Sequence, residues 1–279
     1  MAEGTNGGIR DDAPEVDEHG ALLQQFRYDY AGRCWWCGQT ADSKEHKHKK
    51  SEVKRQLGQG PYTRGVTEQG QHKLYPVQGP DSIQLKFSEV LCGICNSTRS
   101  QAADLAYDKF SEYIAAAAEQ ILDTGQFRWS DIFPRDWRAG RNLVTAYWLK
   151  HIGCRLAESG VEVAPALGAY IDAPGSLRPV PVRMELEIRE DIAEMQQTVP
   201  TGGLWLGDML ASYSRSQGRI TFATSHLGQG WLRMSYEYDT TLRAGSANFW
   251  CKTVHLPRRR SVSPEEMSQA SAQESPGAD

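Results

Sequence analysis

Two pairs of cysteines constrain this chain more than any other feature. Cys34 and Cys37 enclose two tryptophans, and Cys92 and Cys95 form a second C-x-x-C unit. One tight turn of this kind supplies two thiolates to a tetrahedral zinc ion, and two turns complete the coordination shell. A closed shell leaves no position for water, so we expect a structural zinc ion that staples a loop-rich region. A redox pair and buried free thiols are the alternatives, which two such pairs in one chain disfavour.

The composition limits the classes of function. The 279 residues carry a formal net charge of −4, so the whole molecule is not a basic nucleic-acid binder and any phosphate-facing surface must be local. The sequence has no apolar run of about 18 residues, which predicts no membrane-spanning helix. The acidic segment 1–19 lacks the basic and apolar regions of a signal peptide, so we expect a cytoplasmic protein. We expect the two remaining cysteines, Cys154 and Cys251, to be buried as hydrophobic residues.

Between the cysteine pairs lies the dipeptide Glu45-His46, and Asn96 directly follows the last cysteine. A carboxylate oxygen suits Mg²⁺, Mn²⁺ or Ca²⁺, and a neutral imidazole suits proton abstraction from water. Asn96 offers a second hard oxygen ligand at a position that the zinc ion would fix. Arg99 follows one helical turn later and would share the face of Asn96. A Glu-His dipeptide alone favours a solvated polar turn, but its place between the two pairs favours a catalytic role.

Basic side chains gather around this dipeptide. Contacts from lysine and arginine to phosphate supply non-specific affinity for nucleic acid, so we interpret the group as a candidate DNA-binding surface. An ordinary solvated face is the alternative. The members of the group are Lys44, Lys47, Lys49, Lys50, Lys54 and Arg55.

The rest of the chain predicts an α+β fold. Apolar residues at helical spacing indicate helices over about 106–121 and 141–158. A short helix is expected at 190–197, and from about residue 177 onward alternating apolar residues and glycine-containing turns indicate a meandering antiparallel sheet. Its expected strands cover 182–188, 204–213, 219–224, 231–238 and 247–254. The expected division is a disordered acidic N-terminus (1–20), a zinc domain (21–125), an α+β domain of unassigned role (126–256) and a disordered tail (257–279).

The order Cys-x-x-Cys, Glu-His, then Leu-Cys-x-x-Cys-Asn-x-x-Arg resembles the HNH endonucleases, the zinc-bearing branch of the ββα-metal nucleases. The resemblance covers about residues 31–112 and implies a zinc-stapled ββα-metal module followed by helices and sheet. It implies that His46 is the general base, that Glu45 and Asn96 hold one Mg²⁺ or Mn²⁺ ion, and that Arg99 supports the scissile phosphate. The implied activity is hydrolysis of the phosphodiester bonds of DNA. DNA is therefore the expected partner, and no association with a membrane is expected.

One position of the family pattern is not matched. The family's middle asparagine orients the catalytic histidine, but no asparagine occurs between Glu45 and Cys95. Phe87 and Ser88 occupy this region, and either Ser88 or a backbone carbonyl would take over the role. The missing asparagine favours a second hypothesis, a non-catalytic zinc module that binds nucleic acid or protein. A third hypothesis is a redox-responsive protein whose C-x-x-C pairs cycle between dithiol and disulfide.

Overall fold

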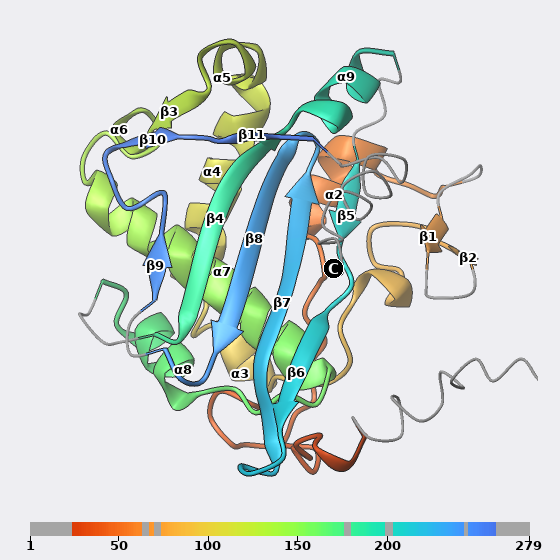
Figure 1. Cartoon of the computed structure of the whole chain (residues 1–279). Helices are drawn as coiled ribbons and strands as arrows, with labels where there is room; N and C mark the ends of the chain where they lie inside the picture. The colour runs from red at the N-terminus through yellow and green to blue at the C-terminus, as the bar shows by residue number, and fades with distance from the viewer. Residues whose placement is uncertain are drawn as a thin grey trace, which may run out of the picture.

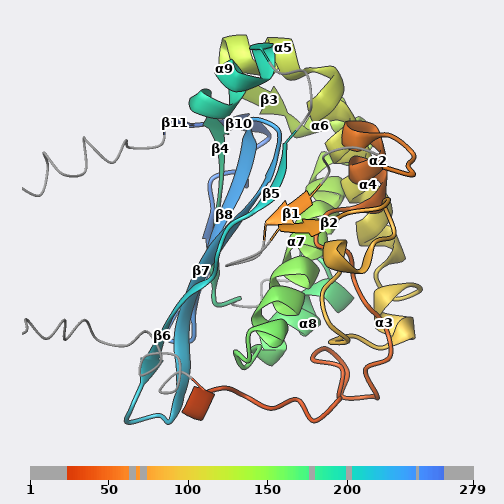
Figure 2. The same cartoon turned by 90° about the vertical axis from the view of Figure 1, so that its right-hand side faces the viewer.

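Helices cover one face of a β-sheet in the computed structural model of the chain (Figure 1). The structure describes residues 24–62, 67–69, 74–175, 180–198, 203–242 and 245–260. The predicted disordered segment 1–20 lies outside these residues, as does most of the predicted tail. Seen from the side, the sheet forms one layer and the helices a second (Figure 2). This mixture of helix and sheet confirms the predicted α+β class.

Three long antiparallel strands form the centre of the sheet, in the order β4, β8, β7. β5 and β6 pair antiparallel with β7, whereas β9 and β11 pair parallel with β4. The predicted antiparallel meander is therefore confirmed for β6, β7 and β8. β4 also pairs antiparallel with β8, but its other neighbours, β9 and β11, run parallel to it. The strands are β4 (Val182–Arg189), β5 (Leu204–Leu206), β6 (Leu210–Ser214), β7 (Arg219–Gln229), β8 (Leu232–Asp239), β9 (Ser246–Ala247) and β11 (Arg258–Arg259).

The long helix α7 (Trp137–Glu158) lies across the covered face of the sheet (Figures 1 and 2). It packs against α4 (Gln101–Ala116) and α8 (Pro165–Asp172), so that its segment 144–157 is buried at nearly every position. The helix predicted over 141–158 is confirmed within α7, which begins four residues earlier, whereas the helix predicted over 106–121 is in fact two helices, α4 and α5 (Ala118–Thr124), that meet at Ala117. Gly125 ends α5, where it adopts a left-handed φ of 68° that favours glycine.

Shorter elements connect these two layers. β1 pairs with β2, and β3 pairs with β10, each in a small antiparallel sheet. These elements are α2 (Lys50–Leu57), β1 (Thr67–Gln69), β2 (Leu74–Pro76), η1 (Ile83–Leu85), α3 (Gly93–Asn96), β3 (Gln126–Arg128), α6 (Trp129–Ile132), α9 (Glu190–Thr198) and β10 (Thr253–His255). α2, η1 and α3 lie in the predicted zinc domain. Val53 of α2 and Leu85 of η1 belong to a small hydrophobic cluster against which Leu204 of β5 packs, and α2 lies beside β5 at the edge of the sheet (Figure 1).

One hydrophobic core runs through the predicted zinc domain and the predicted α+β domain. It includes Leu91 beside the second cysteine pair, Trp148 of α7 and Leu186 of β4, each at most 1% exposed. The apolar face of the sheet and the zinc-bearing region therefore share α7 as a common packing surface. The expected boundary between residues 125 and 126 crosses this continuous core.

Three expectations for the C-terminal part need correction. Cys154 is buried as predicted, but Cys251 is exposed and lies between β9 and β10 outside any strand. The predicted strand 247–254 is in fact two short strands, separated by a turn that buries Phe249. The predicted tail also starts later than residue 257, because Arg258 and Arg259 pair with β4.

Candidate functional site

The four cysteines of the two C-x-x-C pairs converge. Their Sγ atoms all lie within 4.8 Å of one another, and those of Cys37 and Cys92 are 3.5 Å apart. Thiolates about 2.3 Å from one zinc ion in a tetrahedron would lie about 3.8 Å from each other. The backbone N–H of Cys95 donates to the Cys92 sulfur at 3.4 Å. The cysteines therefore form a cluster that fits a zinc ion, as the sequence predicts.

The first cysteine pair is docked onto the helical layer by its two tryptophans. A Cβ atom on Gly153 of α7 would lie 2.3 Å from the Trp35 ring, and one on Gly168 of α8 would lie 2.6 Å from the Trp36 ring. Only glycine permits approaches this close. The tryptophans are thus packing residues that fix the cysteine cluster against α7 and α8.

The segment after the first cysteine pair runs antiparallel to the segment before the second. Ser43 pairs with Leu91, and His46 pairs with Lys86. The chain then enters α3, which Cys92 caps and which ends at Asn96. The side-chain Nδ2 of Asn96 donates a 2.8 Å hydrogen bond to Ser43 Oγ. The cysteine cluster therefore lies where the Glu45-His46 segment and the Asn96 helix meet.

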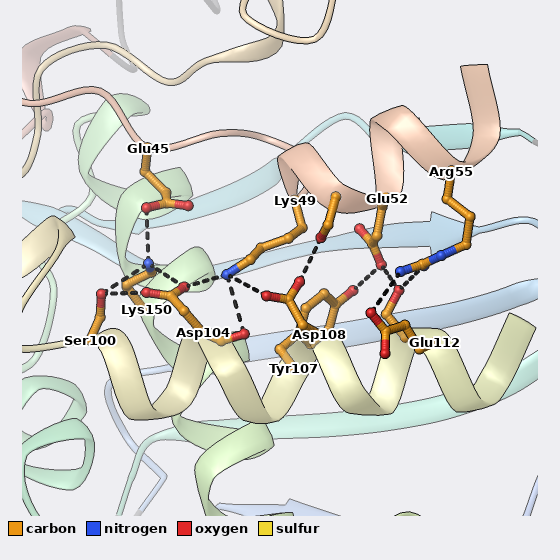
Figure 3. Close-up of polar contacts among 12 residues, drawn as sticks. Glu45, Lys49, Glu52, Arg55, Ser100, Asp104, Tyr107, Asp108, Glu112 and Lys150 are labelled. Atoms are coloured by element: carbon orange, nitrogen blue, oxygen red, sulfur yellow. Dashed lines mark hydrogen bonds and ion pairs between the residues drawn. The ribbon is translucent and has the colours of Figure 1, made fainter. Parts of the chain in front are cut away.

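The Glu45 carboxylate points into the protein (Figure 3). Its Oε2 atom accepts a 2.9 Å hydrogen bond from Lys150 Nζ of α7, and this ammonium also donates to Asp104 Oδ1 at 2.9 Å and Ser100 Oγ at 3.3 Å. Lys150 is only 1% exposed. Burial lowers the pKa of Lys150, but the two carboxylates raise it more, so the ammonium remains charged.

A divalent ion at Glu45 would have to compete with this ammonium. Glu45 and Asp104 carry two negative charges, and Lys150 and Lys49 balance them, since Lys49 Nζ lies 3.1 Å from Asp104 Oδ1. Asn96 fits an ion better, because its buried Oδ1 atom has no hydrogen-bond partner within the described part of the chain. The arrangement at Glu45 therefore does not fit a catalytic Mg²⁺ or Mn²⁺ ion, and that cofactor remains a prediction from the family resemblance.

The His46 ring has surroundings of a different kind. Its Nε2 atom lies 3.8 Å from Asp81 Oδ1 and has no hydrogen-bond partner among the residues that the structure describes. Burial lowers the pKa of His46 below its ordinary value, as does Lys86, and these effects exceed the opposite effects of Glu45, Asp81 and the Pro80 backbone. The imidazole is therefore neutral at pH 7 and can accept a proton.

Arg99 is held at the zinc cluster. Its guanidinium makes a bidentate ion pair with Asp172 of α8, with N–O distances of 2.7 and 2.6 Å. It also lies 4.6 Å from the Trp36 ring centroid and donates to Cys95 Sγ at 3.5 Å. A contact between Arg99 and a scissile phosphate would require this pair to open.

Two of the predicted DNA-binding lysines, Lys44 and Lys50, are partly exposed and pair with acids at the surface. Lys50 Nζ is 2.5 Å from Asp81 Oδ2, and Lys44 Nζ is 3.8 Å from Glu89 Oε1. Lys86, which the sequence prediction omits, also approaches Asp81 at 4.0 Å. The Asp81 side chain is 61% exposed. Lys50, Lys86 and His46 thus surround one solvent-accessible carboxylate.

Two other predicted DNA-binding residues turn toward α4. Lys49 donates to the Asp104 backbone carbonyl at 3.2 Å in addition to its carboxylate contact. Arg55 donates to Ser111 Oγ at 2.7 Å and lies 4.0 Å from Glu112 (Figure 3). Their charges are therefore used within the protein.

The remaining two lysines differ again. Lys47 contributes its backbone carbonyl to a 2.7 Å hydrogen bond with His151 Nε2 of α7, and Lys54 is half-buried in the last turn of α2. Neither arrangement tests a contact with DNA, which remains a prediction for the whole group.

A polar interface continues between α2 and α4 (Figure 3). Glu52 is 2% exposed and accepts hydrogen bonds from the Tyr107 hydroxyl at 2.8 Å and the Ser111 hydroxyl at 2.9 Å. Burial raises the pKa of Glu52 above its ordinary value. Ser51 Oγ donates to Asp108 Oδ1 at 2.5 Å. These contacts fix α2, and with it the segment that carries His46, against the helical layer.

Sequence reasoning missed Lys150, Asp104 and Asp81. A signal for Lys150 was available, since it is a single lysine within an almost wholly apolar stretch of α7, and a buried ammonium requires acidic partners. Asp104 and Asp81 have no such signal, because acids on a helix or in a loop are usually solvated. The predicted orienting residue Ser88 donates its backbone N–H to Glu158 Oε1 at 2.9 Å.

No helix in the described ranges is both long and apolar enough to cross a membrane. Comparisons of the chain with protein-family models, with curated proteins and with solved structures find no match. The functional assignment must therefore come from the residues and their geometry.

Proposed function

We propose that the chain is an HNH-type endonuclease that hydrolyses DNA phosphodiester bonds, with His46 as the general base. The observation that carries the proposal is a neutral histidine whose Nε2 atom lacks a hydrogen-bond partner among the described residues. The cysteine pairs that flank this segment in the sequence form a cluster suited to zinc, which would hold it in place.

In the proposed reaction, His46 takes a proton from the water molecule that attacks phosphorus. A phosphorus–oxygen bond forms to this water while the bond from phosphorus to the 3′-oxygen breaks. The leaving oxygen takes a proton from solvent, so the products are a 5′-phosphate and a 3′-hydroxyl. A neutral imidazole is the form that this step requires.

The cations near His46 suggest where the phosphate would bind. Lys50, Lys86 and His46 all lie within 4.0 Å of the Asp81 carboxylate. A phosphate could replace this carboxylate beside the ammonium groups of Lys50 and Lys86, with the neutral His46 ring next to it, because both groups are oxyanions. The Asp81 side chain is largely exposed and can swing away, which would also uncover His46 Nε2.

A second candidate function is a non-catalytic zinc module that binds nucleic acid or protein. The contact between Lys150 and Glu45 favours it, because the carboxylate that the family uses for a metal ion is already neutralised. The closed ion pair of Arg99 with Asp172 favours it as well. Under this alternative the same surface binds DNA without cleaving it.

The experiment is plasmid nicking by zinc-loaded full-length protein, in buffer with and without Mg²⁺ or Mn²⁺. The endonuclease proposal predicts conversion of supercoiled to nicked or linear plasmid, and a loss of at least about 100-fold in rate for His46→Ala. His255→Ala is the matched control, because this exposed histidine lies in β10 and not in the zinc-bearing region. DNA binding without cleavage, or a His46→Ala variant that cleaves at the wild-type rate, would contradict the proposal and favour the second candidate.

A further inference from the structure

Three oxygen groups surround the Lys150 ammonium in the interior of the protein. Its Nζ atom is 2.9 Å from Glu45 Oε2, 2.9 Å from Asp104 Oδ1 and 3.3 Å from Ser100 Oγ (Figure 3). Glu45 comes from the segment after the first cysteine pair, whereas Ser100 and Asp104 lie four residues apart at the start of α4. They form a cradle for a cation that the fold itself assembles.

The donor set is of the kind that hard divalent cations use. Two carboxylates and a hydroxyl would suit Mg²⁺ or Mn²⁺, with water completing the shell. The distances, however, are those of hydrogen bonds, since Mg²⁺ binds oxygen at about 2.1 Å. The cradle therefore holds the Lys150 ammonium at hydrogen-bonding distance, although its oxygen groups are of the kind that bind a divalent metal ion.

The surroundings hold Lys150 in this position. Its side chain is 1% exposed, and the ammonium lies 5.6 Å from the Tyr147 ring centroid. Lys49 lies 3.1 Å from the same Asp104 oxygen and is shared with Asp108 at 3.7 Å, so Lys150 is the one ammonium that contacts both Glu45 and Asp104. Withdrawing Lys150 would leave the buried Glu45 carboxylate and the half-buried Asp104 carboxylate without this ammonium, which is costly in an environment of low polarity.

We propose that Lys150 is the built-in cation of the Glu45–Asp104–Ser100 cradle, and that it takes the place of a divalent metal ion at Glu45. The native protein then binds no Mg²⁺ or Mn²⁺ through Glu45, and shortening Lys150 opens a divalent-cation site there. This inference concerns the cradle alone and does not depend on whether His46 hydrolyses DNA.

The test is a Mn²⁺ titration of zinc-loaded full-length protein, with unbound Mn²⁺ measured by electron paramagnetic resonance and stability measured as Tm. Wild type is expected to bind no Mn²⁺ at the cradle, so that Glu45→Gln leaves the titration unchanged. Lys150→Ala is expected to bind about one Mn²⁺ ion per chain and to gain several degrees in Tm when Mn²⁺ is added. Lys109→Ala, which removes an exposed lysine from α4, is the matched control and is expected to behave as wild type.

Two results would overturn the proposal. One is a wild-type protein that binds Mn²⁺ and loses this binding in Glu45→Gln, because the ammonium would then yield to the metal. The other is a folded Lys150→Ala variant that binds no Mn²⁺. If Lys150→Ala does not fold, the test is the Tm of the double variant Glu45→Gln/Lys150→Met compared with the Tm of Lys150→Met. The proposal predicts a Tm roughly ten degrees above that of Lys150→Met, because the double variant removes both opposite charges together. An equal Tm for the two variants would contradict it.

Discussion

Glu45 and His46 are neighbours in the sequence but have opposite surroundings. The carboxylate of Glu45 meets a lysine that is 1% exposed, in a group of four charges that cancel. The ring of His46 meets Asp81, whose side chain is 61% exposed and which also contacts Lys50. A buried and paired carboxylate holds elements together, whereas a neutral imidazole beside an exposed acid is the group that we propose takes a proton from water.

The same contrast extends along the segment from residue 43 to residue 55. Its inward-facing charges, Glu45, Lys49 and Glu52, all find partners on α4 or α7. Its outward-facing charges, Lys44 and Lys50, pair only with acids at the surface. The inward face therefore belongs to the architecture of the protein, and the outward face is the one to which we propose that DNA binds.

Loss of the cysteine cluster should disrupt the surroundings of both Glu45 and His46. Cys92→Ser removes one of the four thiolates, and a structural zinc ion contributes on the order of 10 kcal/mol to folding. We expect the variant to lose its zinc and the ordered structure around residues 34–96, as measured by metal analysis and circular dichroism. Cys251→Ser is the control, since this exposed cysteine lies outside the cluster. A folded Cys92→Ser protein would show that the cluster is dispensable.

The inward face can be tested by comparing two aspartates of α4. Asp104 contacts the buried ammonium of Lys150, whereas Asp108 contacts Ser51 and lies 3.7 Å from Lys49. We expect Asp104→Asn to lower the free energy of unfolding by about 3 kcal/mol, because it leaves a buried cation short of a partner. Asp108→Asn should cost about 1 kcal/mol. Urea denaturation measures both, and equal losses would remove the distinction between them.

His151 makes the inward face sensitive to acid. Burial is the main cause that lowers its pKa to about 4, and Arg155 and Lys150 lower it further, against the effect of the Lys47 carbonyl. In the unfolded chain the His151 ring has a pKa near 6.5. The stability that depends on keeping this ring neutral is therefore fully present above pH 6.5 and is lost as the pH falls toward 4. The loss from His151 alone is about 3 kcal/mol at pH 4. His151→Gln should remove this share of the pH dependence in urea denaturation, and an unchanged pH profile would contradict the assignment.

The outward face should respond to the removal of Asp81. If a phosphate binds among Lys50, Lys86 and His46, then Asp81→Asn removes a competing anion, and we expect DNA affinity to rise about threefold at low salt. Fluorescence polarisation with a short duplex measures the change. Glu237→Gln is the matched control, because it opens an exposed ion pair with Arg183 on the sheet. If both variants change affinity equally, the effect is one of net charge only.

More of the fold than of the candidate site could be predicted from the sequence. Cysteine spacing predicted the metal cluster, helical spacing predicted α4 and α7, and alternation predicted β4 and β8, because each signal is local. The pairing of Glu45 with Lys150 could not be predicted from local patterns, because it depends on how α7 packs against the region that contains the cysteine pairs. The position of Asp81 beside His46 likewise depends on the course of a long loop, and loops of this kind have no periodic pattern.

The central claim is that Glu45 is architectural and His46 is functional, and plasmid nicking by Glu45→Gln/Lys150→Met tests it most directly. This double variant removes the inward charge pair while leaving His46 and its surface partners in place. Our account predicts nicking within about threefold of the wild-type rate, under conditions in which His46→Ala is inactive. A folded double variant that no longer nicks would contradict the claim, because Glu45 would then take part in the reaction. A wild-type protein that does not nick would contradict it at once.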